Sequence, residues 1–64
     1  MLTHEWQELE VLTERIAALR DRFHDARRSQ QVGLMTGLQE DLARAKRMRE
    51  QVLQHLAVRM ASQA

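Results

Sequence analysis

The chain has 64 residues, no cysteine, no proline and a formal net charge of +1. A chain this short forms one domain at most and buries only about 60% of its unfolded surface, so association with another molecule is an expected source of stability. The lack of cysteine excludes disulfides and thiolate metal sites. The near-neutral charge gives no strong indication of binding to nucleic acid, and no membrane partner is expected.

The first half of the chain has the apolar periodicity of a long helix. Two interleaved series, each with a seven-residue spacing, contain Leu2, Leu9, Ile16 and Phe23, and then Leu12, Leu19 and Ala26. Series that alternate at three and four residues form the seam of a helix packed against another helix. We therefore expect a helix over residues 3–32, with Trp6 widening the apolar stripe near its start.

The second half has a wider and less regular stripe. Helical spacing relates Leu38, Leu42, Ala45, Val52 and Leu56, and the stripe is flanked by Met48, Leu53 and Met60. Arg49 occupies a seam position, where its aliphatic stem can pack while its charge stays in water. We expect a second helix over residues 37–62.

The expected break between the helices lies at residues 33–36. Gly33 can adopt the left-handed conformation that ends a helix, and Thr36 suits the N-cap of the next helix, with Gln39 completing a capping box. A short connection makes the helices antiparallel neighbours. The predicted fold is all-α: an antiparallel two-helix hairpin, dimerising into a four-helix bundle. The rival is one continuous helix in a coiled coil, with two interior glycines that cost about 1 kcal/mol each.

A turn centred near Leu34 predicts a register for the seam. It places Phe23 opposite Ala45, Ile16 opposite Val52 and Leu12 opposite Leu56. In this register His4 and His55 do not face each other. The three histidines of the chain then lie apart, and no metal site is expected.

Two helices alone leave part of each apolar stripe uncovered, and such surfaces usually mark interaction sites. The candidate protein-interface residues are Trp6, Leu2, Leu9, Leu34, Met35, Met48, Leu53 and Met60. Trp6 is the best candidate for a binding anchor, although it is equally suited to covering the open end of the seam. The expected partner is a second copy of the chain, a heterologous protein, or both.

A basic stretch in the second helix gives an alternative function. Arg44, Lys46, Arg47 and Arg49 are candidates for contacts with nucleic-acid phosphates, although nearby carboxylates oppose this interpretation and no aromatic residues interleave with them. A purely structural module for homo-oligomerisation is a third possibility. Neither a catalytic motif nor a phosphate-binding loop is present, so we expect no enzyme, no cofactor and no small-molecule substrate.

The sequence thus favours a small protein–protein interaction module: an adaptor, a co-chaperone or an inhibitor. In size and expected architecture it is similar to the helical-hairpin co-chaperones of type III secretion needle subunits and to small phage-encoded inhibitors of host proteins. This similarity is architectural, and no motif is shared residue by residue. All basic residues except Lys46 are arginines, a bias that suggests a bacterial or phage origin. No signal peptide is recognised, and the expected location is the cytoplasm.

Overall fold

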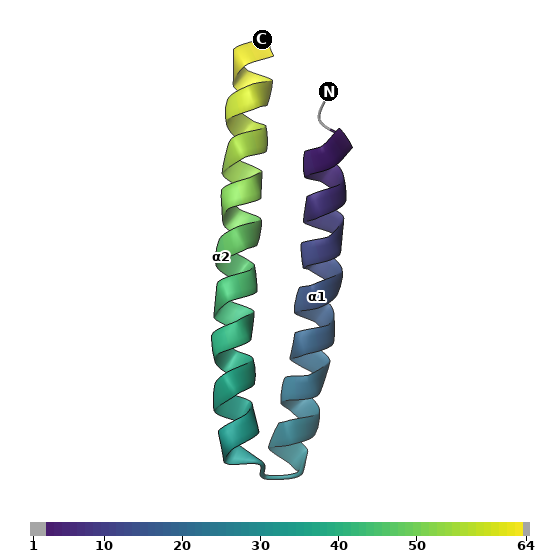
Figure 1. The fold of residues 1–64 in the computed structure, drawn as a ribbon, viewed down its shortest axis with the longest axis vertical. Coiled ribbons are helices and arrows are strands. Elements are labelled where there is room, and N and C mark those ends of the chain that lie inside the picture. The colour runs from purple at the N-terminus through teal and green to yellow at the C-terminus, as the bar shows by residue number, and fades with distance from the viewer. Residues whose placement is uncertain (1–2, 64) are drawn as a thin grey trace.

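The computed structural model describes residues 3–63, which form two helices packed side by side. α1 spans Thr3–Arg28 and α2 spans Val32–Gln63. The helices run antiparallel, with the turn at one end of the molecule and the start of α1 near the end of α2 at the other (Figure 1). The rod measures 50 × 15 × 12 Å. The all-α two-helix hairpin is confirmed, and the described residues contain no strand.

The turn lies earlier in the chain than the predicted residues 33–36. α1 ends at Arg28, and residues 29–31 connect it to α2. Gln30 adopts the left-handed conformation, with φ 57°. The Gln31 amide donates to the Ala26 carbonyl at 2.9 Å, and the Gln30 amide donates to the Arg27 carbonyl at 3.1 Å. This pair of bonds is the Schellman motif that ends helices, here built on glutamine rather than glycine.

The residues predicted to form the turn belong to α2. Both Gly33 and Gly37 are helical, and neither has a positive φ. Thr36 is not an N-cap, because its hydroxyl donates to the Val32 carbonyl within the helix at 3.2 Å. At the start of α2, the Met35 amide donates a hydrogen bond to the Gln31 carbonyl at 3.0 Å. The prediction relied on glycine, whereas the seam decides the turn: its apolar positions stop at Ala26 and resume at Met35.

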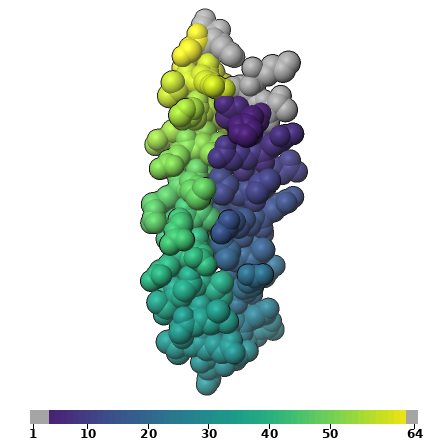
Figure 2. All heavy atoms as spheres, in the orientation of Figure 1, coloured from purple at the N-terminus to yellow at the C-terminus, as the bar shows by residue number. Residues whose placement is uncertain are grey.

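The core is a single line of side chains between the helices. Eight apolar residues are buried: Leu12, Ile16, Leu19, Ala26, Leu38, Ala45, Val52 and Leu56. They form two clusters. The larger lies toward the turn, with Phe23, Met35 and Leu42 packed against it, and the smaller joins Leu12, Val52 and Leu56 near the open end. The helices contact each other along the length of the rod (Figure 2).

The seam residues were predicted well, but their register is displaced. Phe23 and Ala45 belong to one cluster and Leu12 and Leu56 to the other, in agreement with the predicted pairs. Ile16 and Val52, however, lie in different clusters. Glu5 pairs with Arg59. A hairpin centred on Leu34 would instead place Glu5 opposite Gln63, which lies about one helical turn farther along α2. The earlier turn at Gln30 accounts for this displacement.

Candidate protein-interaction site

Three large apolar side chains lie exposed on one flank of the hairpin near its open end. Trp6 is 51% exposed, Leu53 40% and Met60 55%. Trp6 follows Glu5 in the sequence, and Met60 follows Arg59, the two residues that meet in the seam. Because the helices are antiparallel, residues that directly follow seam partners lie on the same flank. Leu53 precedes Met60 by seven residues and shares its line along α2. We call these three residues the Trp6 edge.

The structure distributes the remaining predicted interface residues over other parts of the hairpin. Leu34 is exposed on α2 near the turn, and Met48 is exposed on the flank opposite the Trp6 edge. Leu9 is half-buried against the smaller cluster, and Met35 is half-buried against the larger one. Both contribute to the core rather than to a free surface. Leu2 lies outside the described residues.

The basic stretch of α2 spreads around the helix instead of forming one patch. Arg44, Lys46 and Arg47 are exposed, and Arg49 is half-buried at its seam position. The Arg44 guanidinium lies 3.8 Å from the Asp41 carboxylate, which offsets part of its charge. Lys46 and Arg47 form no ion pair within the described residues.

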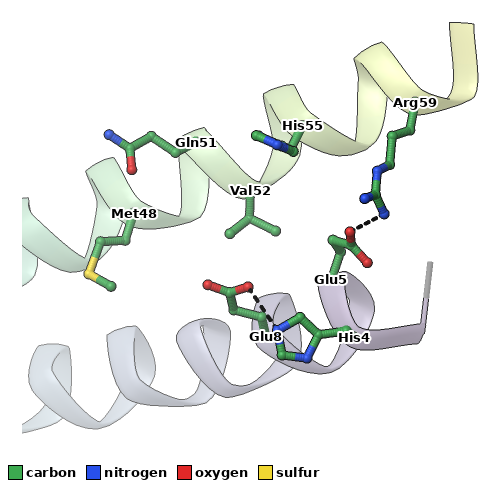
Figure 3. Close-up of a pocket in the computed structure, with 8 residues that line it drawn as sticks. All are labelled: His4, Glu5, Glu8, Met48, Gln51, Val52, His55 and Arg59. Carbon is green, nitrogen blue, oxygen red and sulfur yellow. Dashed lines mark hydrogen bonds and ion pairs between the residues drawn. The ribbon is translucent and has the colours of Figure 1, made fainter. Parts of the chain in front are cut away.

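An open groove runs along the flank opposite the Trp6 edge, with a volume of about 350 Å³. We call it the His55 groove, and Figure 3 shows its lining residues: His4, Glu5, Glu8, Met48, Gln51, Val52, His55 and Arg59. The side chains of α1 approach those of α2 here, and Val52 points from α2 toward α1. The His4 imidazole lies 4.0 Å from the Glu8 carboxylate.

The carboxylate of Glu5 is the best-enclosed acidic group of this groove. Its side chain is 13% exposed, its Oε1 accepts a hydrogen bond from Arg59, and its buried Oε2 has no hydrogen-bond partner within the described residues. The pKa of Glu5 lies below the usual 4.5, first because the carboxylate interacts with its own backbone amide in the first turn of α1. The nearby Arg59 lowers the pKa further, against the opposing effect of desolvation.

Sequence reasoning missed that His4 and His55 line the same groove. The predicted register kept them apart, and the error of about one turn in that register explains the miss. The last seam residue of the first helix is Ala26 and the first of the second helix is Met35. A turn placed midway between them would have predicted a register in which His4 and His55 lie close together. Residues 3–63 hold no group of three or more His, Asp or Glu side chains with the geometry of a metal site.

A second shallow groove lies on the same flank as the Trp6 edge, nearer the turn. We call it the Phe23 groove; it has a volume of about 360 Å³ and is lined by Phe23, Gln39, Leu42, Ala43 and Lys46. Gln39 and Lys46 continue the seven-residue line of Leu53 and Met60 along α2, which places the groove on this flank. Its floor is the exposed side of the larger core cluster.

Charge divides unevenly between the two ends of the rod. The open half, residues 1–14 and 50–64, contains five glutamates and one arginine, a net charge of −4. Residues 15–49, which form the turn half, carry a net charge of +5, and the two halves together give the chain's total of +1. Residues 50–64 are neutral by themselves, so the charge of the open half comes from the four glutamates of residues 1–14, and the hairpin has one acidic end and one basic end.

Neither helix contains a stretch within the described residues that is both apolar and long enough to cross a lipid bilayer. Comparison with protein-family models, curated proteins and solved structures finds no match to this chain.

Proposed function

We propose that the hairpin is a small protein–protein interaction module that binds through the Trp6 edge. The observation that supports this most is the exposure of Trp6, Leu53 and Met60 together on one flank. Full burial of an exposed large apolar side chain yields about 1.5–3 kcal/mol, and these three, at 40–55% exposure, have roughly half of that still to gain. Three such residues on a rigid pair of helices therefore provide a sufficient anchor, and tryptophan is the residue type most enriched at binding hot spots.

In this proposal the protein is encoded by a bacterium or a phage and works in the bacterial cytoplasm as an adaptor, co-chaperone or inhibitor. Each of these activities requires a stable surface rather than a catalytic cavity. The seam holds the backbone of the Trp6 edge through Val52, Leu56 and Leu9, which pack in or against the smaller core cluster. The apolar side chains are thus presented in a fixed arrangement, which lowers the entropic cost of binding.

Site-specific photo-crosslinking tests the proposal in cells that produce the protein naturally. A photoreactive phenylalanine derivative at position 6 should give protein adducts, either with another protein or with a second copy of the chain. The same group at Val11, which is 62% exposed on α1 away from the Trp6 edge, is the matched control and should give far fewer adducts. Equal adducts at both positions, or none at position 6, would overturn the proposal.

Nucleic-acid binding is the second candidate, favoured by one observation. The turn half carries a net charge of +5. Against it, Asp25 pairs with Arg28 and Asp41 with Arg44, so the acidic residues are interspersed with the cations. Binding to DNA or RNA would weaken steeply with salt, whereas binding through the Trp6 edge would change little. An affinity for DNA or RNA that falls by orders of magnitude between about 50 and 200 mM salt, as phosphate contacts predict, would favour this candidate.

A further inference from the structure

We propose that the partner of the Trp6 edge is a second copy of this chain, packed side by side in the antiparallel orientation. In this arrangement Trp6 of each copy occupies the Phe23 groove of the other. The inference rests on the proposed function, because it uses the same edge, and it adds the identity of the partner and the way the partner is seated.

The exposed area of the hairpin fits a dimer. The chain exposes 5164 Å², whereas a compact monomer of its 7.5 kDa mass is expected to expose about 4,200 Å². The excess is about 900 Å², close to the roughly 800 Å² that each partner contributes to a stable interface. A second hairpin laid along one flank removes surface of this size.

Trp6 can occupy the Phe23 groove of another copy of the chain but not the groove of its own chain. Both lie on the same flank, and Trp6 is about 26 Å from Phe23 along α1 at 1.5 Å per residue. Trp6 therefore cannot reach the groove of its own chain. Two antiparallel copies, related by a two-fold axis midway between these features, bring each Trp6 to the partner's groove at the same time. Such a self-complementary contact is the geometry of an isologous dimer.

The chemistry of the groove suits an indole ring. Phe23 and Leu42 provide an apolar floor, Ala43 leaves space beside them, and Lys46 lies at the rim. A lysine ammonium close to an indole face adds a favourable cation–π interaction.

Charge selects the antiparallel orientation over the parallel one. In the antiparallel pair the acidic open half of each copy, with −4, lies along the basic turn half of the other, with +5. Parallel packing would set acidic against acidic and basic against basic ends. Like charges in juxtaposition disfavour an orientation, and complementary ones fix the register. Contact through the two open ends alone would also bring together two acidic surfaces.

Measurement of mass by sedimentation equilibrium across a concentration series tests the dimer itself. We expect twice the 7.5 kDa of one chain at high concentration. Trp6→Ala should weaken dimerisation by at least about 30-fold, the effect of losing a hot-spot residue. Ala43→Glu should weaken it by at least about tenfold, because it places a charge in the Phe23 groove. The matched controls are Val11→Ala and Ala18→Glu, which are exposed on α1 away from this flank and should leave the mass distribution unchanged.

Fluorescence quenching tests the orientation, because the chain has one tryptophan and no cysteine. A quencher is attached through Asp21→Cys, beside the Phe23 groove but outside its lining, or through Gln7→Cys near the open end, in a chain that also carries Trp6→Phe, and the labelled chain is mixed with wild type. The antiparallel dimer predicts strong quenching of wild-type Trp6 from position 21 and weak quenching from position 7. Equal quenching from both positions, or stronger quenching from position 7, would contradict the antiparallel seating.

A monomer at all accessible concentrations, or a dimer unaffected by both Trp6→Ala and Ala43→Glu, would overturn this inference. The proposed function is tested separately. Adducts with a different protein at position 6 would support it even when the chain is monomeric. A monomer that also gives no adducts at position 6 would overturn both.

Discussion

The Glu5 carboxylate and the Arg59 guanidinium meet across the seam at the open end of the hairpin. Both occupy positions that the seven-residue series reserves for apolar side chains: Glu5 lies one such interval before Leu12, and Arg59 follows Val52 by the same interval. The last layer of the core is thus an ion pair. An ion pair at this place fixes the register of the helices through charge and geometry, where apolar side chains would allow slippage.

This ion pair makes the stability of the hairpin depend on pH in a specific range. The folded state lowers the pKa of Glu5 below 4.5, so its contribution to stability is present above that pH and is lost as the pH falls through the lowered pKa. Glu5→Gln removes the charge at all pH values. The variant should melt at a lower temperature than wild type near pH 6, and the difference should shrink as the pH falls below about 4.5.

Thermal melts followed by circular dichroism at several pH values check this prediction. Glu14→Gln is the control, because Glu14 is exposed and makes no ion pair within the described part of the chain. Its melting temperature should follow that of wild type across the pH range. A Glu5→Gln difference that stays constant down to pH 3 would contradict the assigned role of Glu5.

The glycines give a prediction of opposite sign to the one that the sequence alone suggests. A Cβ added to Gly33 or Gly37 meets no heavy atom within 4 Å, and neither residue has a positive φ. Alanine should therefore stabilise the hairpin by roughly 0.5–1 kcal/mol, more at Gly37 because it lies deeper in α2. If either glycine ended a helix, alanine there would destabilise. Urea unfolding checks the sign, with Ala17→Gly in α1 as a reverse control that should cost a similar amount.

The sequence predicts the pairing of the two helices better than it predicts the turn between them. The seam positions from Leu12 to Ala26 follow directly from the seven-residue repeat. Four of them are buried as expected, Leu12, Ile16, Leu19 and Ala26, and Phe23 is half-buried. The turn does not follow, because Gln30 has no intrinsic preference for the left-handed conformation and is held there by the packing on either side. The same limit applies to the His55 groove and the Phe23 groove. Both depend on the register, which an error of one helical turn changes.

Gln30 is the place where the chain departs most from its local preference. A residue with a side chain costs about 1–2 kcal/mol in the left-handed region, and glycine avoids this cost. Gln30→Gly should therefore stabilise the hairpin by about 0.5–1 kcal/mol, after allowance for the greater freedom of glycine in the unfolded chain. Chemical denaturation measures the difference. Ser29→Gly, one residue earlier and without a positive φ, should destabilise instead, and equal gains at both positions would refute the explanation.

The division of the core into two clusters predicts that the ends of the hairpin differ in stability. The cluster at the open end contains three buried residues, whereas the one toward the turn contains five. Leu56 is 3% exposed in the smaller cluster, so Leu56→Ala should cost about 2–4 kcal/mol. Val58, only two residues away, is 66% exposed, and Val58→Ala should change stability by less than about 0.5 kcal/mol.

Amide hydrogen exchange locates this effect along the chain. In the wild type, amides around Val52 and Leu56 should exchange faster than those around Ala45, because fewer buried contacts oppose local opening there. Leu56→Ala should accelerate exchange mainly at the open end and leave the amides near Ala45 closer to their wild-type rates. Uniform acceleration in both regions would show that the hairpin opens as one cooperative unit. The Trp6 edge would then lose its fixed arrangement only when the whole chain unfolds, rather than by fraying of the open end.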